Sequence, residues 1–162
     1  MNPEKLAEYQ IWADGVIIRL LRELSPEEFD RDVLPPFGSI RNLCTHIILA
    51  MEFNLEGRAH KKRIDPNQIG EEINSLDQEA LLAKWKGTDE KLLEYAKTRV
   101  EEDYAFPNFL GEGEMRVGSG DFFMQYLLHT QHHRGQIMSA LRAMGKEAKS
   151  TDYLFYLSYL AS

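Results

Sequence analysis

Apolar side chains recur every three or four positions over four long stretches of the chain, which is the pattern of amphipathic helices. These stretches cover about residues 3–24, 40–60, 76–100 and 121–144. The first shows the pattern clearly, with one stripe made of Leu6, Tyr9, Ala13, Val16, Ile17, Leu20 and Leu24. A helix buries such a stripe only against a partner, so four helices packed in one bundle is the economical arrangement.

Polar and helix-breaking residues between the stretches mark the helix ends. Two segments, Ser25-Pro-Glu-Glu28 and Ser75-Leu-Asp-Gln78, match the capping box that satisfies the first backbone N–H groups of a helix. The first predicts a short helix, which Pro35-Pro36 then breaks. The second predicts the start of the third long helix.

Other boundaries rest on single residues. Ser39 and Ser119 are candidate N-caps for the second and fourth long helices, and Gly145 suits the position that follows the end of the fourth. The polar segment around Pro66 and Gly70 predicts a loop.

Residues 104–120 change in character, because apolar positions alternate around two glycines, Gly111 and Gly113. This pattern predicts either a short β-hairpin or an irregular loop. Residues 150–160 predict a last short helix rich in aromatic side chains. With no internal repeat and no linker, residues 1–162 are predicted to form one all-α domain: a four-helix bundle with a hairpin or loop insertion and short extra helices.

Composition narrows the class of protein. The 162 residues carry a net charge of −7, which argues against a nucleic acid as the main ligand. No apolar run reaches the roughly 18 residues of a membrane span, and the N-terminal residues lack the order of a signal peptide. One cysteine, Cys44, cannot form an internal disulfide, which suits a reducing compartment. We therefore expect a cytoplasmic protein with neither nucleic-acid nor membrane partners.

Three of the five histidines lie within five positions of the fourth long helix. At about 100° per residue, His129 and His133 fall about 40° apart on the stripe that also carries Phe122 and Tyr126, whereas His132 falls at its edge. Two core histidines satisfied by hydrogen bonds are one interpretation. The other is half of a metal site, since a metal would hold two uncharged imidazoles that are costly to bury alone.

A metal site needs at least a third protein ligand. His46 shares the inward stripe of the second helix with Leu43 and Ile47, whereas His60 stands among cations that would disfavour a divalent metal. Cys44 and Glu52 point to other faces, so a buried thiol and a non-ligand carboxylate are expected. Three histidines, His46, His129 and His133, would leave a position open for water or substrate. No carboxylate is placed by spacing as a general base.

Several segments resemble the DinB superfamily of metal-binding helical proteins. The most specific is His129-x-x-x-His133-Arg134-Gly135-Gln136, which is similar to the family's signature in the fourth helix. Weaker matches are Tyr9-Gln-Ile-Trp12-Ala13-Asp14, where an Asn is usual in place of Asp14, then Ser39-Ile-x-Asn-Leu-x-x-His46, and Thr151-Asp152-Tyr. The resemblance covers nearly the whole chain.

The resemblance implies a four-helix bundle with a long crossover connection, a homodimer, and a divalent metal, most often zinc or nickel, on His46, His129 and His133. Some relatives transfer a low-molecular-weight thiol such as bacillithiol, mycothiol or glutathione to an electrophile. A metal with neutral ligands keeps its positive charge and would favour the nucleophilic thiolate. We therefore expect a metal-dependent enzyme with a small-molecule substrate. Its two candidate activities are those of a thiol S-transferase and of a related hydrolase. The alternatives are a non-enzymatic, damage-inducible metal-binding protein of the stress response and a structural dimerisation bundle.

Four features keep two interpretations each. Arg134 points away from the ligand stripe and is expected to form an ion pair or a capping contact. Gln136 could orient a ligand histidine or only pack in the core. Tyr126 and Trp12 could line a cavity or belong to the core. The aromatic cluster from Tyr153 to Tyr159 could pack on the bundle or form a dimer contact.

Overall fold

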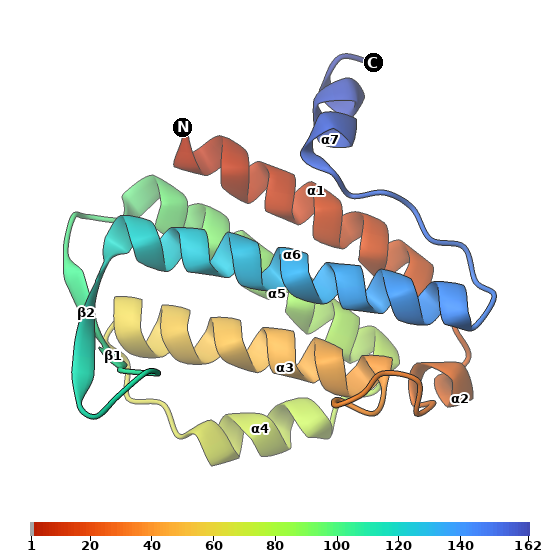
Figure 1. Ribbon diagram of the computed structural model, residues 1–162, viewed down its shortest axis with the longest axis horizontal. Helices are drawn as coiled ribbons and strands as arrows, with labels where there is room; N and C mark the ends of the chain where they lie inside the picture. The colour runs from red at the N-terminus through yellow and green to blue at the C-terminus, as the bar shows by residue number, and fades with distance from the viewer. Residues whose placement is uncertain (1) are drawn as a thin grey trace.

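The computed structural model describes residues 2–162 and is mostly helical, as predicted (Figure 1). The helices are α1 (Pro3–Leu21), α2 (Pro26–Phe29), α3 (Ile40–Glu52), α4 (Pro66–Asn74), α5 (Gln78–Thr98), α6 (Ser119–Ala143) and α7 (Tyr153–Leu160). A π-helical segment, η1 (Phe53–Ala59), continues α3. Two strands, β1 (Asp103–Pro107) and β2 (Glu114–Gly118), form an antiparallel hairpin.

The four long helices pack around a common core. Helix α1 contacts α5 and α6, and α3 contacts the same two helices, so α1 and α3 lie diagonally across the core from each other (Figure 1). The apolar stripes of all four helices meet there, and the largest fully buried side chains include Trp85, Phe122, Ile17, Leu43 and Ile47. Burying these stripes is the main favourable term for a fold of this kind.

The predicted caps around α2 and α3 are confirmed. Ser25 and Glu28 form the full capping box, with the Ser25 N–H donating to Glu28 and the Glu28 N–H donating to Ser25 Oγ. Ser39 caps α3 by accepting from the Asn42 N–H at 3.2 Å. Helix α1 ends at Leu21 rather than Leu24, because the chain turns before the α2 cap.

The predicted helix over 40–60 is continuous, but its last part is not α-helical. From Phe53 to Ala59 the helix widens to π geometry, which turns this segment toward the hairpin. Arg58 Nη1 donates to the Ala105 carbonyl of β1, and its guanidinium lies over the Phe106 ring with the centroid at 4.3 Å. Such local widening is often found near functional sites.

The loop predicted around Pro66 and Gly70 is wrong, because residues 66–74 form helix α4. Asp65 caps it by accepting from the Asn67 N–H, and Pro66 takes the first helical position, where its missing N–H costs nothing. Ile73 is fully buried on the underside of α4. The cap and the proline are both readable in the sequence.

Two further cap assignments are also wrong. Helix α5 is capped by Asp77, which accepts from the Ala80 N–H at 2.8 Å, while Ser75 lies at the end of α4. Helix α6 begins at Ser119 with Gly118 as N-cap and no side-chain cap. The Ser119 hydroxyl instead accepts from Arg99 Nη1 at 2.9 Å, because the hairpin brings the start of α6 beside the end of α5.

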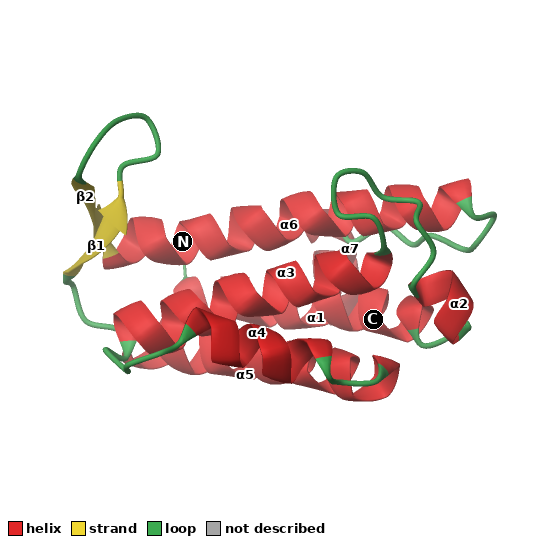
Figure 2. Ribbon diagram, turned by 90° about the horizontal axis from the view of Figure 1, so that it is seen from below, coloured by secondary structure: helices red, strands yellow, loops and turns green. Residues whose placement is uncertain are grey.

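The predicted hairpin is confirmed and projects from one end of the helical body (Figure 2). Tyr104 pairs with Val117, and Phe106 pairs with Met115. Gly113 adopts a φ of 81° in the connecting loop, a conformation that glycine reaches without steric cost. Tyr104 is buried against Phe122 of α6, which attaches the hairpin to the core.

The C-terminal segment packs on α1. Gly145 has the positive φ predicted for the residue after α6. Tyr156 of α7 is buried, and its ring centroid lies 5.8 Å from that of Tyr9 and 5.7 Å from that of Trp12. Tyr159, in contrast, is largely exposed. Among the helices of residues 2–162, none has the length and apolar character needed to cross a membrane.

Candidate metal centre

Three histidines from two neighbouring helices meet where α3 packs against α6. His46 Nε2 lies 3.3 Å from His129 Nε2, and His133 Nε2 lies 3.1 Å from the same atom. One ring nitrogen from each residue falls within 4.8 Å of the others. The structure thus brings together the three side chains that the helical wheels placed on inward faces.

The donor set fits a divalent metal. Zinc–nitrogen bonds are about 2.0–2.1 Å long, so two nitrogens on one tetrahedral ion stand ~3.3 Å apart. The separations of 3.1 and 3.3 Å between Nε2 atoms match this spacing. Three neutral imidazoles are also the set that leaves a coordination position free for a further ligand.

The surroundings keep the three imidazoles neutral, which is the form that binds a metal. Burial, together with the neighbouring His133 and His46, lowers the pKa of His129 to about 4. Burial is also the main cause that lowers the pKa of His46 and of His133. At neutral pH, therefore, each of the three is a neutral imidazole with one unprotonated ring nitrogen that can bind a metal.

Gln136 orients one of these imidazoles. His133 Nδ1 donates to Gln136 Oε1 over 2.7 Å, which leaves the lone pair of His133 Nε2 directed at the other two histidines. The orienting role considered for Gln136 from the sequence is thus present. In contrast, His129 Nδ1 is buried without a hydrogen-bond partner among the described residues.

The other sequence candidates lie outside the cluster, as expected. His132 is exposed on the edge of α6. His60 lies beside Glu56, Cys44 is fully buried, and Glu52 is paired with Lys91 at 2.8 Å. Burial raises the pKa of the Cys44 thiol, so this side chain stays protonated and behaves as a small apolar residue.

One neighbour of the cluster was not predicted. The Phe37 ring lies 5.1 Å from the His46 ring and 5.5 Å from the His133 ring, between centroids. Phe37 therefore covers His46 and His133 with an apolar surface. Its position depends on the loop that precedes α3, and sequence periodicity carries no information about such a loop.

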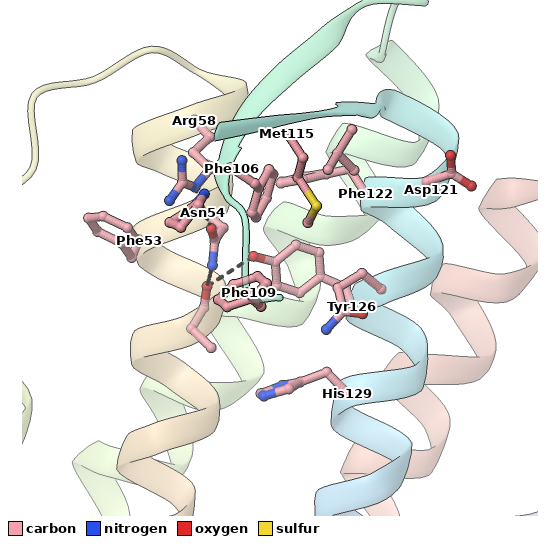
Figure 3. Close-up of a pocket in the computed structure, with 14 residues that line it drawn as sticks. Phe53, Asn54, Arg58, Phe106, Phe109, Met115, Asp121, Phe122, Tyr126 and His129 are labelled. Atoms are coloured by element: carbon pink, nitrogen blue, oxygen red, sulfur yellow. Dashed lines mark hydrogen bonds between the residues drawn. The ribbon is translucent and has the colours of Figure 1, made fainter. Parts of the chain in front are cut away.

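Two cavities border the cluster. A cavity of about 570 Å³ has His129 in its wall and extends between η1, α6 and the hairpin (Figure 3). Tyr126 lines it, so one of the two interpretations of this residue is supported. A smaller cavity of about 260 Å³ borders His46, and Phe53 lines both. Trp12 lines a different cavity between α1, α5 and α7, with no histidine in its wall.

A buried charged network supports α6 from the side opposite the cavity. Arg134 Nη1 lies 2.6 Å from Asp14 Oδ1, with the two side chains 1% and 0% exposed, so the ion pair expected for Arg134 is present. Gln10 accepts from Arg134, and Trp85 Nε1 donates to Asp14 at 3.1 Å. This network ties α1 and α5 to the helix that carries two of the three histidines.

Asp89 adjoins this network and was missed by the sequence reasoning. It is almost fully buried on α5, and burial together with the charge of Asp14 raises the pKa of its carboxyl well above the usual range. A protonated Asp89 can donate to Asp14, which relieves the repulsion between two buried carboxylates. Its only signal in the sequence was an acidic residue on the apolar stripe of a helix.

Comparisons with known proteins show the family of this chain. The family model described as "DinB family" matches residues 1–160. Protein DinB of Bacillus subtilis (strain 168) is 24% identical over 159 residues, which are 94% of this chain and 92% of that protein.

Two crystal structures share the fold. One, of a protein from Exiguobacterium sibiricum 255-15 assigned to the DinB family, has a TM-score of 0.69 at 14% identity and covers 93% of this chain and 97% of its own. The other, of a DinB-like protein from Bacillus cereus ATCC 10987, has a TM-score of 0.65 at 16% identity and covers 93% and 99%. Because the family model matches residues 1–160, the chain belongs to the DinB family.

Proposed function

We propose that the protein binds one divalent metal ion on His46, His129 and His133 and uses it to transfer a low-molecular-weight thiol to an electrophile. The observation that carries this proposal is the convergence of three neutral imidazole nitrogens beside a cavity of about 570 Å³. A closed structural site has no need of a cavity at its metal. Zinc and nickel are the ions we favour, since both accept imidazole ligands.

A divalent cation in this site would lower the pKa of an approaching thiol, so that the nucleophilic thiolate is present at neutral pH. The thiolate sulfur then forms a bond to the electrophilic carbon, and the leaving group departs with the electrons of its own bond. The three imidazoles contribute no negative charge, so the cation keeps its full attraction for thiolate. Gln136 holds His133 in the tautomer that this arrangement needs.

The protein side chains have a limited part in this chemistry. Among residues 2–162, no carboxylate joins the three histidines in the cluster, so none of these residues is positioned there as a general base. The work left to the chain is to hold the ion, to fix the imidazole orientations, and to exclude water. Phe37 serves the last of these by its contacts with His46 and His133.

The proposal also includes the assembly. The four long helices, with α1 diagonal to α3, are consistent with a four-helix bundle that has a long crossover connection. The apolar side chains exposed on α7, among them Leu154, Phe155 and Leu160, are candidates for a homodimer contact. The partners would then be a second copy of the chain and a small-molecule substrate, in the cytoplasm.

A non-enzymatic metal-binding role is the second candidate, and the missing carboxylate base favours it. The two candidates differ in what should occupy the remaining coordination positions. An enzyme keeps one for an exchangeable ligand, whereas a storage or structural site closes it with a protein group.

Metal stoichiometry tests the site. We expect one zinc or nickel per chain in the wild-type protein, less than a tenth of that in His129→Ala, and a full complement in His132→Ala. His132 is the control because it lies on the same helix but outside the cluster. Equal metal content in all three proteins would refute the site.

Activity is tested separately. The metal-loaded protein is incubated with bacillithiol or glutathione and a chloronitrobenzene, and the release of chloride is measured. A rate that depends on both the protein and the metal supports thiol transfer. A full metal complement with no rate above background would leave the non-enzymatic candidate in its place.

A further inference from the structure

The cavity beside His129 has walls made mostly of apolar and aromatic side chains. They come from three separate elements: Phe53 from η1, Phe106 and Met115 from the hairpin, and Phe122 and Tyr126 from α6. Figure 3 shows His129 at one end of this space, with its ring directed toward α3, and the hairpin side chains at the other end. The cavity therefore leads from the three-histidine cluster to the hairpin.

The polar groups of the cavity are largely engaged with the protein itself. The Tyr126 hydroxyl donates to the Ala50 carbonyl at 3.0 Å, and Asn54 Nδ2 donates to the same carbonyl at 2.7 Å. Asn54 Oδ1 in turn accepts from Arg58 Nε at 2.7 Å. A ligand in this space consequently finds few free hydrogen-bonding groups in the inner wall.

The charge distribution disfavours an anion. Arg58 is the single cation in the wall, and its guanidinium is already held by Asn54 and by the Ala105 carbonyl and lies over the Phe106 ring. The other charged residue of the wall is Asp121, which is exposed and would repel a negative ligand. An acidic ligand would lose its hydration here without gaining a partner.

The hairpin contributes apolar surface that has no protein partner. Phe109 is 76% exposed and Met115 is 39% exposed, although both line the cavity. Large exposed apolar side chains that border a cavity commonly mark a binding site. A ligand between them and α6 would remove this surface from water.

We propose that this cavity binds a neutral, apolar molecule with one or two aromatic ring systems, which is the electrophile of the proposed reaction, and that the β1–β2 hairpin forms its outer wall. The volume of about 570 Å³ lies within the roughly 300–1,000 Å³ of small-molecule sites. The identification of the ligand as the electrophile rests on the proposed function, whereas its binding and its neutral, aromatic class do not.

Two fluorescent probes that differ by one charge test the ligand class. N-phenyl-naphthylamine is neutral, and anilinonaphthalene sulfonate carries the same rings with an added sulfonate. We expect the neutral probe to bind one per chain and at least ten-fold more tightly than the sulfonate. Equal or tighter binding of the sulfonate would overturn the proposal.

Matched variants locate the probe. Met115→Trp fills the cavity from the hairpin and should weaken the neutral probe at least ten-fold. Leu110→Trp makes a large aromatic substitution in the same hairpin, but Leu110 is 99% exposed and does not line the cavity, so binding should stay within two-fold. Gln125→Trp fills the cavity from the exposed side of α6 and provides a second blocking variant should Met115→Trp misfold. Unchanged binding in a folded blocking variant would refute the location.

A paramagnetic ion separates this inference from the metal proposal. With cobalt in place of zinc, the proton relaxation of the bound probe should be faster, and the difference should vanish when a chelator removes the cobalt. Removal of the cobalt should leave the probe bound, because the cavity wall keeps all of its side chains. Absence of a cobalt effect in a protein with full cobalt content would place the probe elsewhere and overturn the proposal, whereas low cobalt content would count against the metal site alone.

Discussion

His133 Nδ1 donates a hydrogen bond to Gln136 Oε1 across 2.7 Å, one turn farther along α6. This contact determines which nitrogen of His133 keeps its lone pair, and that nitrogen, Nε2, lies 3.1 Å from His129 Nε2. A side chain outside the three-histidine cluster thus decides whether a ring inside that cluster can act as a metal ligand.

Removing this acceptor should weaken metal binding without removing a ligand. We expect Gln136→Met to lower the affinity for zinc by roughly 10- to 100-fold, the usual effect of losing a partner that orients a metal-binding histidine. Gln136→Glu keeps an oxygen in place and should restore most of the affinity. Competition with a chromophoric chelator measures both, and equal affinities for the Met and Glu variants would contradict the role of the hydrogen bond.

Metal binding should stabilise the fold through all three histidines. A free zinc concentration of 100 times Kd adds about 2.7 kcal/mol to the free energy of unfolding. In a chain of this size, Tm rises by about 2–4 °C for each added kcal/mol. His46→Ala should abolish the increase, because His46 is the one member of the three-histidine cluster that α3 supplies. Thermal unfolding followed by circular dichroism, with and without zinc, measures it. A full zinc-dependent shift in His46→Ala would exclude His46 as a ligand.

The metal-free protein should lose stability as the pH falls. The pKa of His129 is lowered from its ordinary value of 6.5 to about 4 in the folded protein, so between these values the unfolded chain binds more protons than the folded one. The free energy of unfolding therefore falls as the pH is lowered from about 6.5 toward 4. Urea unfolding across this range, in the presence of a chelator, should show a smaller decrease for His129→Gln. An equal decrease in the wild type and in His129→Gln would contradict the lowered pKa of His129.

Breaking the Arg134–Asp14 pair should be strongly destabilising. Both side chains are almost fully buried, so Arg134→Met leaves the Asp14 carboxylate without its main partner. The expected cost is roughly 3–5 kcal/mol. Arg22→Met removes the exposed pair with Glu79, which has the same N–O distance of 2.6 Å, and should cost far less, because water screens this pair. Similar losses in the two variants, measured by urea unfolding, would show that burial does not determine the strength of the pair.

Asp89→Asn should stabilise the protein at neutral pH. Burial and Asp14 raise the pKa of Asp89 in the folded state, so the stability contributed by its protonated form is complete below the unfolded value of 3.8 and decreases as the pH rises above it. An amide does not titrate and can still donate to Asp14. The gain of the variant over the wild type should therefore grow from pH 4 to pH 7 in urea unfolding experiments. A gain that is constant with pH would contradict the raised pKa.

The prediction from sequence succeeded where the determining interactions are local. Helical periodicity places His46, His129 and His133 on the inward faces of their helices, and backbone hydrogen bonds between residues close in sequence impose that periodicity. The caps at Ser25 and Ser39 and the turn at Gly145 were predictable for the same reason. The error at Ser75 arose because two capping residues, Ser75 and Asp77, competed for the start of α5. The error at Ser119 arose because Arg99, at the end of α5, supplied another partner for its hydroxyl.

By itself, then, the sequence determined where the four long helices lie, which faces those helices bury, and which three histidines could share a site. Only the tertiary structure decided that α3 and α6 lie side by side at an axial register that brings the Nε2 atoms to 3.1 and 3.3 Å. The π-helical turn, the Asp14–Asp89 contact and the cavity behind the hairpin likewise appear only in the folded chain. The physical reason is that the periodicity of a helix alone determines which of its side chains face the core. How far the helix is shifted along its axis relative to its neighbours depends on how the whole core packs.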